Sequence, residues 1–150
     1  MKYSQSFEKN SAMSEEFSHP AMSLQEKKPI VFTALSKKYF YMRMLIVRYV
    51  LKNGCVPINP FMSFDYYLTD TVDRNIIRNA NNNLVAIADE LWVFGSISNG
   101  VMAEIRQVRA MKKPIRFFSI ENDRDIAEIQ NDKLLFEDGM ENFKEELESL

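Results

Sequence analysis

Short apolar runs alternate with amphipathic segments along residues 29–150. The runs of four to eight β-branched or aromatic residues predict buried strands, and apolar positions spaced three and four apart predict helices. The predicted elements are, in chain order, a strand at 29–35, a helix at 38–53, a strand at 55–60, a helix at 72–88, a strand at 90–95, a helix at 100–112, a strand within 112–120, a helix at 122–130, a fifth strand at 133–137 and a closing helix at 140–150.

Strands that alternate with helices predict a doubly wound α/β fold, a mainly parallel sheet of four or five strands with helices on both faces. Pro57 suggests an edge position or a bulge for the second strand. In such sheets ligands bind outside the carboxyl ends of the strands. The expected site therefore lies in the loops after these ends, and Ser36, which opens the first loop, is a candidate substrate contact.

The helix predicted at 72–88 has a cap candidate in Asp70 or Thr71 and an expected inward stripe. That stripe is Ile76, Ile77, Ala80, Leu84, Ile87 and Ala88. The closing helix is expected to bury one apolar face. That face is Met140, Phe143, Leu147 and Leu150.

Residues 1–28 lack this periodicity and are rich in Ser, Glu, Lys and Met. We interpret them as a flexible or loosely docked tail ahead of a single domain at 29–150. A helix that pairs with another subunit is the alternative, because Phe7, Met13, Phe17 and Met22 could supply an apolar stripe.

Composition narrows the class of protein. The 150 residues are 46% hydrophobic and 27% charged, which suits one globular domain. Nineteen basic against 21 acidic residues disfavour a nucleic-acid partner or an anionic membrane surface. A single Cys55 and a single His19 supply no metal site and no disulfide, so we expect no metal and no cofactor, and a cytoplasmic location. No apolar run is long enough to span a bilayer.

One carboxylate falls on the apolar stripe of the helix predicted at 100–112. Glu104 shares the angular position of Val101, Ile105, Val108 and Met111, so it is expected to face inward. Burying an unpaired carboxylate is costly unless something compensates, and the nearby helix start offers amides and a positive dipole end. An ionised, partly desolvated carboxylate facing a sheet crevice is a plausible nucleophile.

The turn SISNG joins the preceding strand to this helix. Its Ser96, Ser98, Asn99 and Gly100 are candidate substrate contacts, because backbone amides here can approach phosphate or sugar oxygens. The alternative interpretation is structural: Glu104 stabilises the helix start, and the turn is a capping loop.

The stretch IADELWVFGSISNGVMAEIRQVRAMKKPI resembles the nucleoside 2-deoxyribosyltransferase superfamily, which includes 2'-deoxynucleoside 5'-phosphate N-hydrolases. Ser98, Gly100 and Glu104 match its Ser-x-Gly-x-x-x-Glu motif, and a looser likeness covers residues 29–120. The resemblance implies that Glu104 attacks the anomeric carbon of a deoxyribosyl group and releases the base. It implies that Ser98 and the amides near Asn99 and Gly100 hold the sugar or 5'-phosphate, and that a homo-oligomer completes the pocket.

This chemistry needs a second acidic group. The family commonly has an aspartate about eight residues before its alanine-aspartate pair, where this chain has Asn81, which can bind a substrate but cannot supply a proton. The first strand also lacks the family's glycine-containing loop. Asp65 and Asp70 are the candidates for the missing acid, and Tyr66 between them is a candidate base contact.

Three functions follow as hypotheses. The first is cleavage or transfer at the N-glycosidic bond of a deoxynucleoside or its 5'-monophosphate. The second is a non-catalytic nucleotide-binding module, a sensor or sponge, on the same fold. The third is a structural dimer that needs no pocket, which a filled crevice would indicate.

Overall fold

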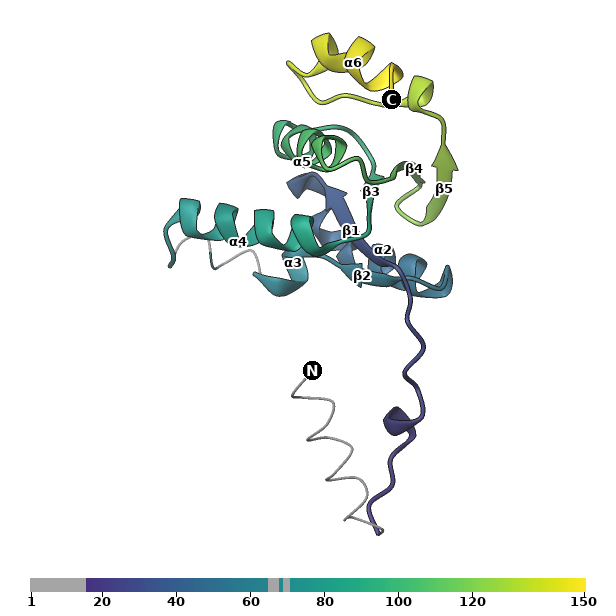
Figure 1. The fold of residues 1–150 in the computed structure, drawn as a ribbon. Helices are drawn as coiled ribbons and strands as arrows, with labels where there is room; N and C mark the ends of the chain where they lie inside the picture. The colour runs from purple at the N-terminus through teal and green to yellow at the C-terminus, as the bar shows by residue number, and fades with distance from the viewer. Residues whose placement is uncertain (1–15, 65–67, 69–70) are drawn as a thin grey trace.

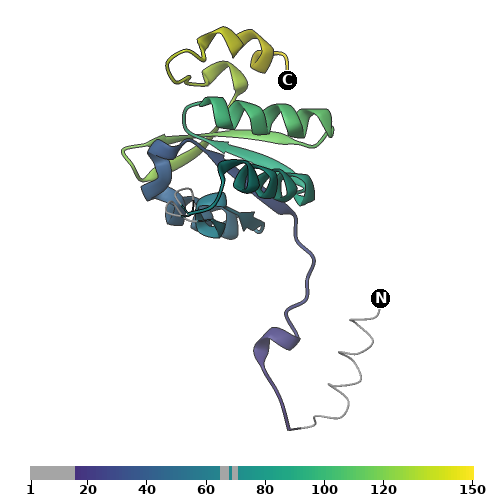
Figure 2. The same ribbon diagram turned by 90° about the vertical axis from the view of Figure 1, so that its left-hand side faces the viewer.

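The computed structural model describes residues 16–64, 68 and 71–150. In it, the described residues from 30 onward form a sheet flanked by helices, and residues 16–29 extend away from this domain (Figures 1 and 2). The elements are η1 (Pro20–Met22), β1 (Ile30–Leu35), η2 (Lys37–Met42), α2 (Arg43–Lys52), β2 (Val56–Ile58), α3 (Pro60–Ser63), α4 (Arg74–Ile87), β3 (Glu90–Phe94), α5 (Asn99–Ala110), β4 (Ile115–Glu121), β5 (Asp125–Ile129), η4 (Asn131–Lys133), η5 (Glu141–Phe143) and α6 (Lys144–Glu148).

The five strands form one sheet in the order β2-β1-β3-β4-β5. The first four are mutually parallel, and β5 runs antiparallel to β4. The predicted doubly wound α/β fold is therefore confirmed, with β2 at an edge as Pro57 suggested.

Both faces of the sheet are buried because alternate residues of the central strands point to opposite sides. On one face, Trp92 and Phe94 of β3 pack with Phe118 and the helix α2. On the other, Leu91 and Val93 pack beneath α4 and α5. The last helix, α6, lies on the side of α5 that faces away from the sheet, where Leu147 is fully buried (Figures 1 and 2).

The chain leaves β1 toward β2 through α2 and then crosses back over β1 to β3 through α4. The direction of winding therefore reverses between β1 and β3. The carboxyl ends of these two strands frame what we call the switch-point crevice, the place where doubly wound sheets bind ligands.

The helix predicted at 122–130 is wrong, since residues 125–129 form the strand β5. Asn122 and Asp123 adopt positive φ values of 53° and 52°, which reverse the chain after β4 into a hairpin. Left-handed backbone is favoured by Asn and Asp, and two such residues in succession are incompatible with a helix at this point.

The strand predicted at 133–137 is also wrong, because only Phe136 forms a bridge there, a parallel one with Ile97. The closing helix is shorter than predicted, and Leu150 is exposed. Met111 was predicted to lie on the inward stripe of the helix at 100–112. It follows the end of α5 instead and is exposed to solvent.

The helix α4 begins later than predicted, because Asp73 caps it and accepts from the amide of Asn75 at 2.8 Å. Two residues of its predicted inward stripe, Ile76 and Ile87, are 62% and 61% exposed. The stripe that faces the sheet is narrower, with Val85 at its centre. None of the described helices has the length and apolar character needed to cross a membrane.

Candidate functional site

Glu104 lies in the second turn of α5 and faces α4. Its Oε2 accepts a hydrogen bond from Nδ2 of Asn81, in the middle of α4, at 2.8 Å. One turn further along α5, Gln107 donates to Asn82 at 2.9 Å. Glu104 thus points into the contact between α4 and α5, where its partner is an uncharged amide of the neighbouring helix.

Burial dominates the electrostatics of Glu104. Loss of water around the carboxyl group raises its pKa from 4.5 to about 7, and the hydrogen bond from Asn81 lowers it only in part. The Oδ1 of Asn81 is shielded from solvent and has no hydrogen-bond partner in the described part of the chain. Burial outweighs the hydrogen bond from Asn81, so the surroundings favour the neutral acid.

The turn before α5 caps this helix, as in the structural interpretation of the SISNG segment. Ser98 is the N-cap, and its Oγ accepts from the amide of Val101 at 3.3 Å. Asn99 and Gly100 are exposed, and a Cβ at Gly100 would meet no atom within 4 Å. The first two residues of the helix therefore face open space, where an anion could approach their backbone.

Buried polar side chains gather at the carboxyl ends of β1, β2 and β3. In the described residues they are Thr33, Ser36, Asn59 and Ser96. Thr33 donates to the carbonyl of Ile58 at 2.9 Å. Asn59 caps α3 through its Oδ1, but its Nδ2 is buried without a partner among these residues. Such an unsatisfied donor is costly in an empty site and useful in one that binds an acceptor.

Tyr39 fills part of the switch-point crevice. It follows β1, on η2, and its ring lies so close to Gly95 that a Cβ there would be 2.5 Å from the ring carbons. Its hydroxyl accepts from the amide of Ser96 at 3.2 Å and donates to Ser96 Oγ at 3.3 Å. The same Oγ donates to Oε2 of Glu137 at 3.2 Å. Three side chains from distant parts of the sequence therefore meet at the end of β3.

The structure brings together some of the predicted site residues. Glu104 and Asn81 are in contact, and Ser96 and Ser36 are buried at the carboxyl edge of the sheet. Asp65, Tyr66 and Asp70 lie outside the described residues. Sequence reasoning missed Asn59 and Glu137 as site residues. The Asn-Pro that ends β2 was a usable signal for Asn59, but no local pattern marks Glu137.

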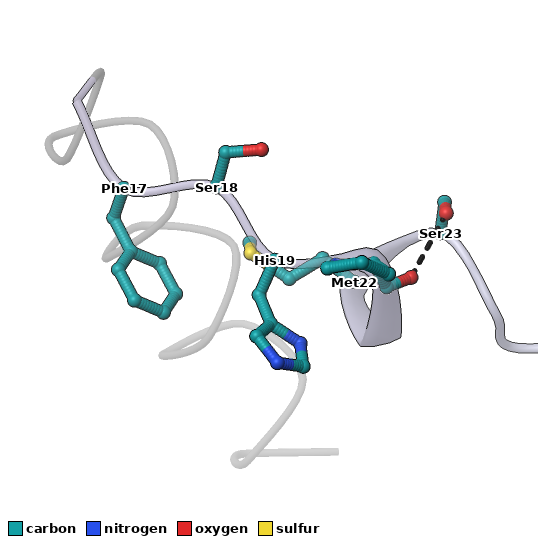
Figure 3. A pocket seen from close by; sticks show the side chains of 6 residues that line it. Phe17, Ser18, His19, Met22 and Ser23 are labelled. Carbon is teal, nitrogen blue, oxygen red and sulfur yellow. Dashed lines mark hydrogen bonds between the residues drawn. The ribbon is translucent and has the colours of Figure 1, made fainter.

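Two hollows in the described surface lie away from Glu104. One runs along the tail and is lined by Phe17, Ser18, His19, Pro20, Met22 and Ser23 (Figure 3). There Nδ1 of His19 accepts from the amide of Ala21 at 3.1 Å, a local cap. The other lies between α2 and β5. We place the candidate site at the carboxyl edge of the sheet and in the adjoining contact between α4 and α5, because the buried polar atoms lie at the first and the perturbed carboxyl group of Glu104 lies in the second. Among the described residues, no group of three or more His, Cys, Asp or Glu could hold a metal ion.

No curated protein matches the chain. A family described as a domain of unknown function (DUF7768) matches residues 34–118, more than half of the sequence. The match includes Glu104, Asn81 and the SISNG turn and ends before Glu137. The chain belongs to the DUF7768 family.

Proposed function

We propose that this protein cleaves or transfers the N-glycosidic bond of a deoxynucleoside or its 5'-monophosphate, with Glu104 as the nucleophile. The observation that carries the proposal is the 2.8 Å contact between Glu104 and Asn81. These are the two positions that the resemblance to nucleoside 2-deoxyribosyltransferases assigns to the pocket, and 23 residues separate them in the sequence. Their meeting between two helices supports the assignment independently of the motif.

The described groups suit the successive needs of this chemistry. The open amino end of α5, at Asn99 and Gly100, is suited to a 5'-phosphate or a sugar oxygen. Glu104 would attack the anomeric carbon and form a glycosyl-enzyme ester, and water or a second base would then release it. Asn81 holds the Glu104 carboxyl group in one orientation while it attacks.

Base release provides the direct test. The protein and its Glu104→Gln variant are incubated with a panel of deoxynucleosides and their 5'-monophosphates, and free base is measured by chromatography. We expect release by the native protein and a loss of at least about a thousandfold in the variant, since removing a nucleophile eliminates the covalent route. Glu145→Gln, an exposed position on α6, is the matched control and should retain full activity. Undiminished release by Glu104→Gln would refute the nucleophile assignment.

The pH dependence separates a nucleophile from a general acid. Glu104 attacks only when ionised, and its pKa is about 7. We therefore expect kcat/KM, which reports the free enzyme, to rise about tenfold per pH unit below pH 7 and to level off above it. A rate that instead falls above pH 7 would assign Glu104 to proton donation.

A non-catalytic nucleotide-binding module is the second candidate. It is favoured by the uncharged Asn81 beside Glu104, and by the ring of Tyr39, which occupies part of the crevice. Thermal stabilisation by a nucleotide, without release of base and with equal shifts in the native and Glu104→Gln proteins, would establish this function in place of catalysis.

We also propose that the protein forms a homo-oligomer. The exposed side chains of Ile76 and Ile87 on α4 offer apolar surface for such a contact.

A further inference from the structure

The carboxyl group of Glu104 lies between α4 and α5 without a counter-charge. In the part of the chain that the structure describes, no lysine or arginine forms an ion pair with it. Arg106, two residues further along α5, pairs with Glu146 of α6 at 2.9 Å. Lys113 donates to two carbonyls at the carboxyl end of α4. An ionised carboxylate shielded from water in this way is costly until a positive group binds beside it.

A second oxygen in the same contact also lacks a partner. Nδ2 of Asn81 donates to Glu104 at 2.8 Å, whereas Oδ1 of Asn81 is shielded from solvent and accepts no hydrogen bond from the described residues. Because Nδ2 and Oδ1 belong to one amide group, the unpaired oxygen lies close to the Glu104 carboxyl group. The described residues thus place two oxygen acceptors here and no cationic side chain.

The side chains that line this contact are amides, which cannot give a proton to a departing base. Asn81 contacts Glu104 directly, and the next pair along the two helices is Gln107 with Asn82. A neutral base leaves poorly as an anion, and a positioned acid typically speeds its departure by about 10²–10⁴. A base that already carries a positive charge leaves as a neutral molecule and needs no acid.

We propose that the preferred substrate of this site carries a positively charged base, an N-alkylated purine or a pyridinium ring, on its deoxyribosyl group. This inference rests on the proposed function and names its substrate class. The positive charge of the ring supplies the counter-charge that Glu104 lacks and stabilises the ionised form that attacks. The same charge removes the need for the second acid that Asn81 cannot provide.

The reaction then needs no proton donor in its first step. Glu104 forms a bond to the anomeric carbon, and the carbon–nitrogen bond breaks with its electron pair going to the ring nitrogen, which loses its positive charge. In the second step, the oxygen of water bonds to the anomeric carbon, and the ester bond breaks with its electron pair returning to Glu104. The water gives one proton to the solvent. The products are the free sugar, a neutral base and that proton.

A matched pair of substrates tests the proposal. 7-Methyl-2'-deoxyguanosine and 2'-deoxyguanosine differ by one methyl group and one positive charge, and each is tried as the nucleoside and as the 5'-monophosphate. After subtraction of spontaneous release, we expect the native protein to release base at least about a hundredfold faster from the methylated member. The deoxyriboside of nicotinamide is the pyridinium arm, and the faster of the two cationic substrates shows which ring the site takes.

Asn81→Asp tests the reason for this preference. A carboxyl group in contact with Glu104 shares a proton with it and can pass that proton to the base. We expect release from 2'-deoxyguanosine to become about tenfold faster or more, so that the preference narrows. Asn82→Asp is the matched control, because it places the same charge at the next position of α4 and keeps an acceptor for Gln107. Its preference should equal that of the native protein.

A preference below about tenfold in the native protein would overturn the substrate class and leave the nucleophile assignment standing, since the proton then comes from an acid elsewhere in the chain. An unchanged preference in Asn81→Asp would overturn the role given to Asn81. If the native protein releases no base from any of these substrates or from the wider panel, the proposed function itself fails.

Discussion

Glu104→Gln is expected to raise the free energy of unfolding at about pH 8 by about 3 kcal/mol while it abolishes base release. The folded protein holds the Glu104 proton up to a pKa of about 7, whereas the unfolded chain releases it near 4.5. At about 1.4 kcal/mol per pH unit, that interval corresponds to about 3 kcal/mol of lost stability once the group is forced to ionise in the fold. Glutamine has a similar shape, stays neutral and still offers an acceptor to Asn81.

The raised pKa of Glu104 determines the pH range over which the native and Glu104→Gln proteins differ in stability. A carboxyl group whose pKa is raised on folding is fully compatible with the fold below pH 4.5, and its contribution is lost as the pH rises toward 7. The native and Glu104→Gln proteins should therefore be about equally stable near pH 4 and diverge progressively up to pH 7. Above that, the difference should remain constant.

Urea denaturation at several pH values measures this difference, and m-values show whether unfolding stays comparable. The exposed Glu145→Gln is the control, and its stability should follow that of the native protein at every pH. If the free energies of unfolding of the native and Glu104→Gln proteins change in parallel between pH 5 and pH 8, folding does not raise the pKa of Glu104. An activity loss coupled to a stability gain would identify Glu104 as a residue retained for chemistry, because a structural role predicts destabilisation on its removal.

The central fold was predictable because its signals are local. The strands β1 and β3 are continuous apolar runs, as strands covered on both faces must be, and both are almost fully buried. The side of α5 on which Glu104 lies was predictable for the same reason, since its spacing from Val101, Ile105 and Val108 places it on the buried stripe of the helix. A charged residue on such a stripe can be recognised from the spacing of its apolar neighbours alone.

The rest depends on contacts between distant segments. The five residues of β5 contain both polar and apolar side chains, and their partner strand decides the conformation more than their propensity does. Glu137 reaches Ser96 only because residues 134–137 run beside Ile97. The carboxyl group of Glu104 finds Asn81 only through the packing of α4 on α5. A motif marks Glu104, but tertiary structure selects its partners.

Gly95→Ala is expected to lower the free energy of unfolding by about 3 kcal/mol. Gly95 adopts φ +80°, and left-handed backbone costs a residue with a Cβ roughly 1–2 kcal/mol. The new Cβ would also be 2.5 Å from the ring of Tyr39, so the ring must move and give up its hydrogen bonds with Ser96. Loss of that packing and of those hydrogen bonds adds about 1–2 kcal/mol.

Gly54 provides a matched control. It adopts φ +78°, but a Cβ there meets no atom within 4 Å, so Gly54→Ala reports the backbone cost alone, about 1–2 kcal/mol. In a Tyr39→Ala background, Gly95→Ala should cost no more than Gly54→Ala, because the clash has been removed. If Gly95→Ala lowers the free energy of unfolding only as much as Gly54→Ala does, even with Tyr39 present, then the Tyr39 ring can move away from residue 95 without a loss of stability. Tyr39 would then move freely, and a substrate could open the crevice itself. A larger cost would mean that the ring is held in place, and that a substrate must bind against it.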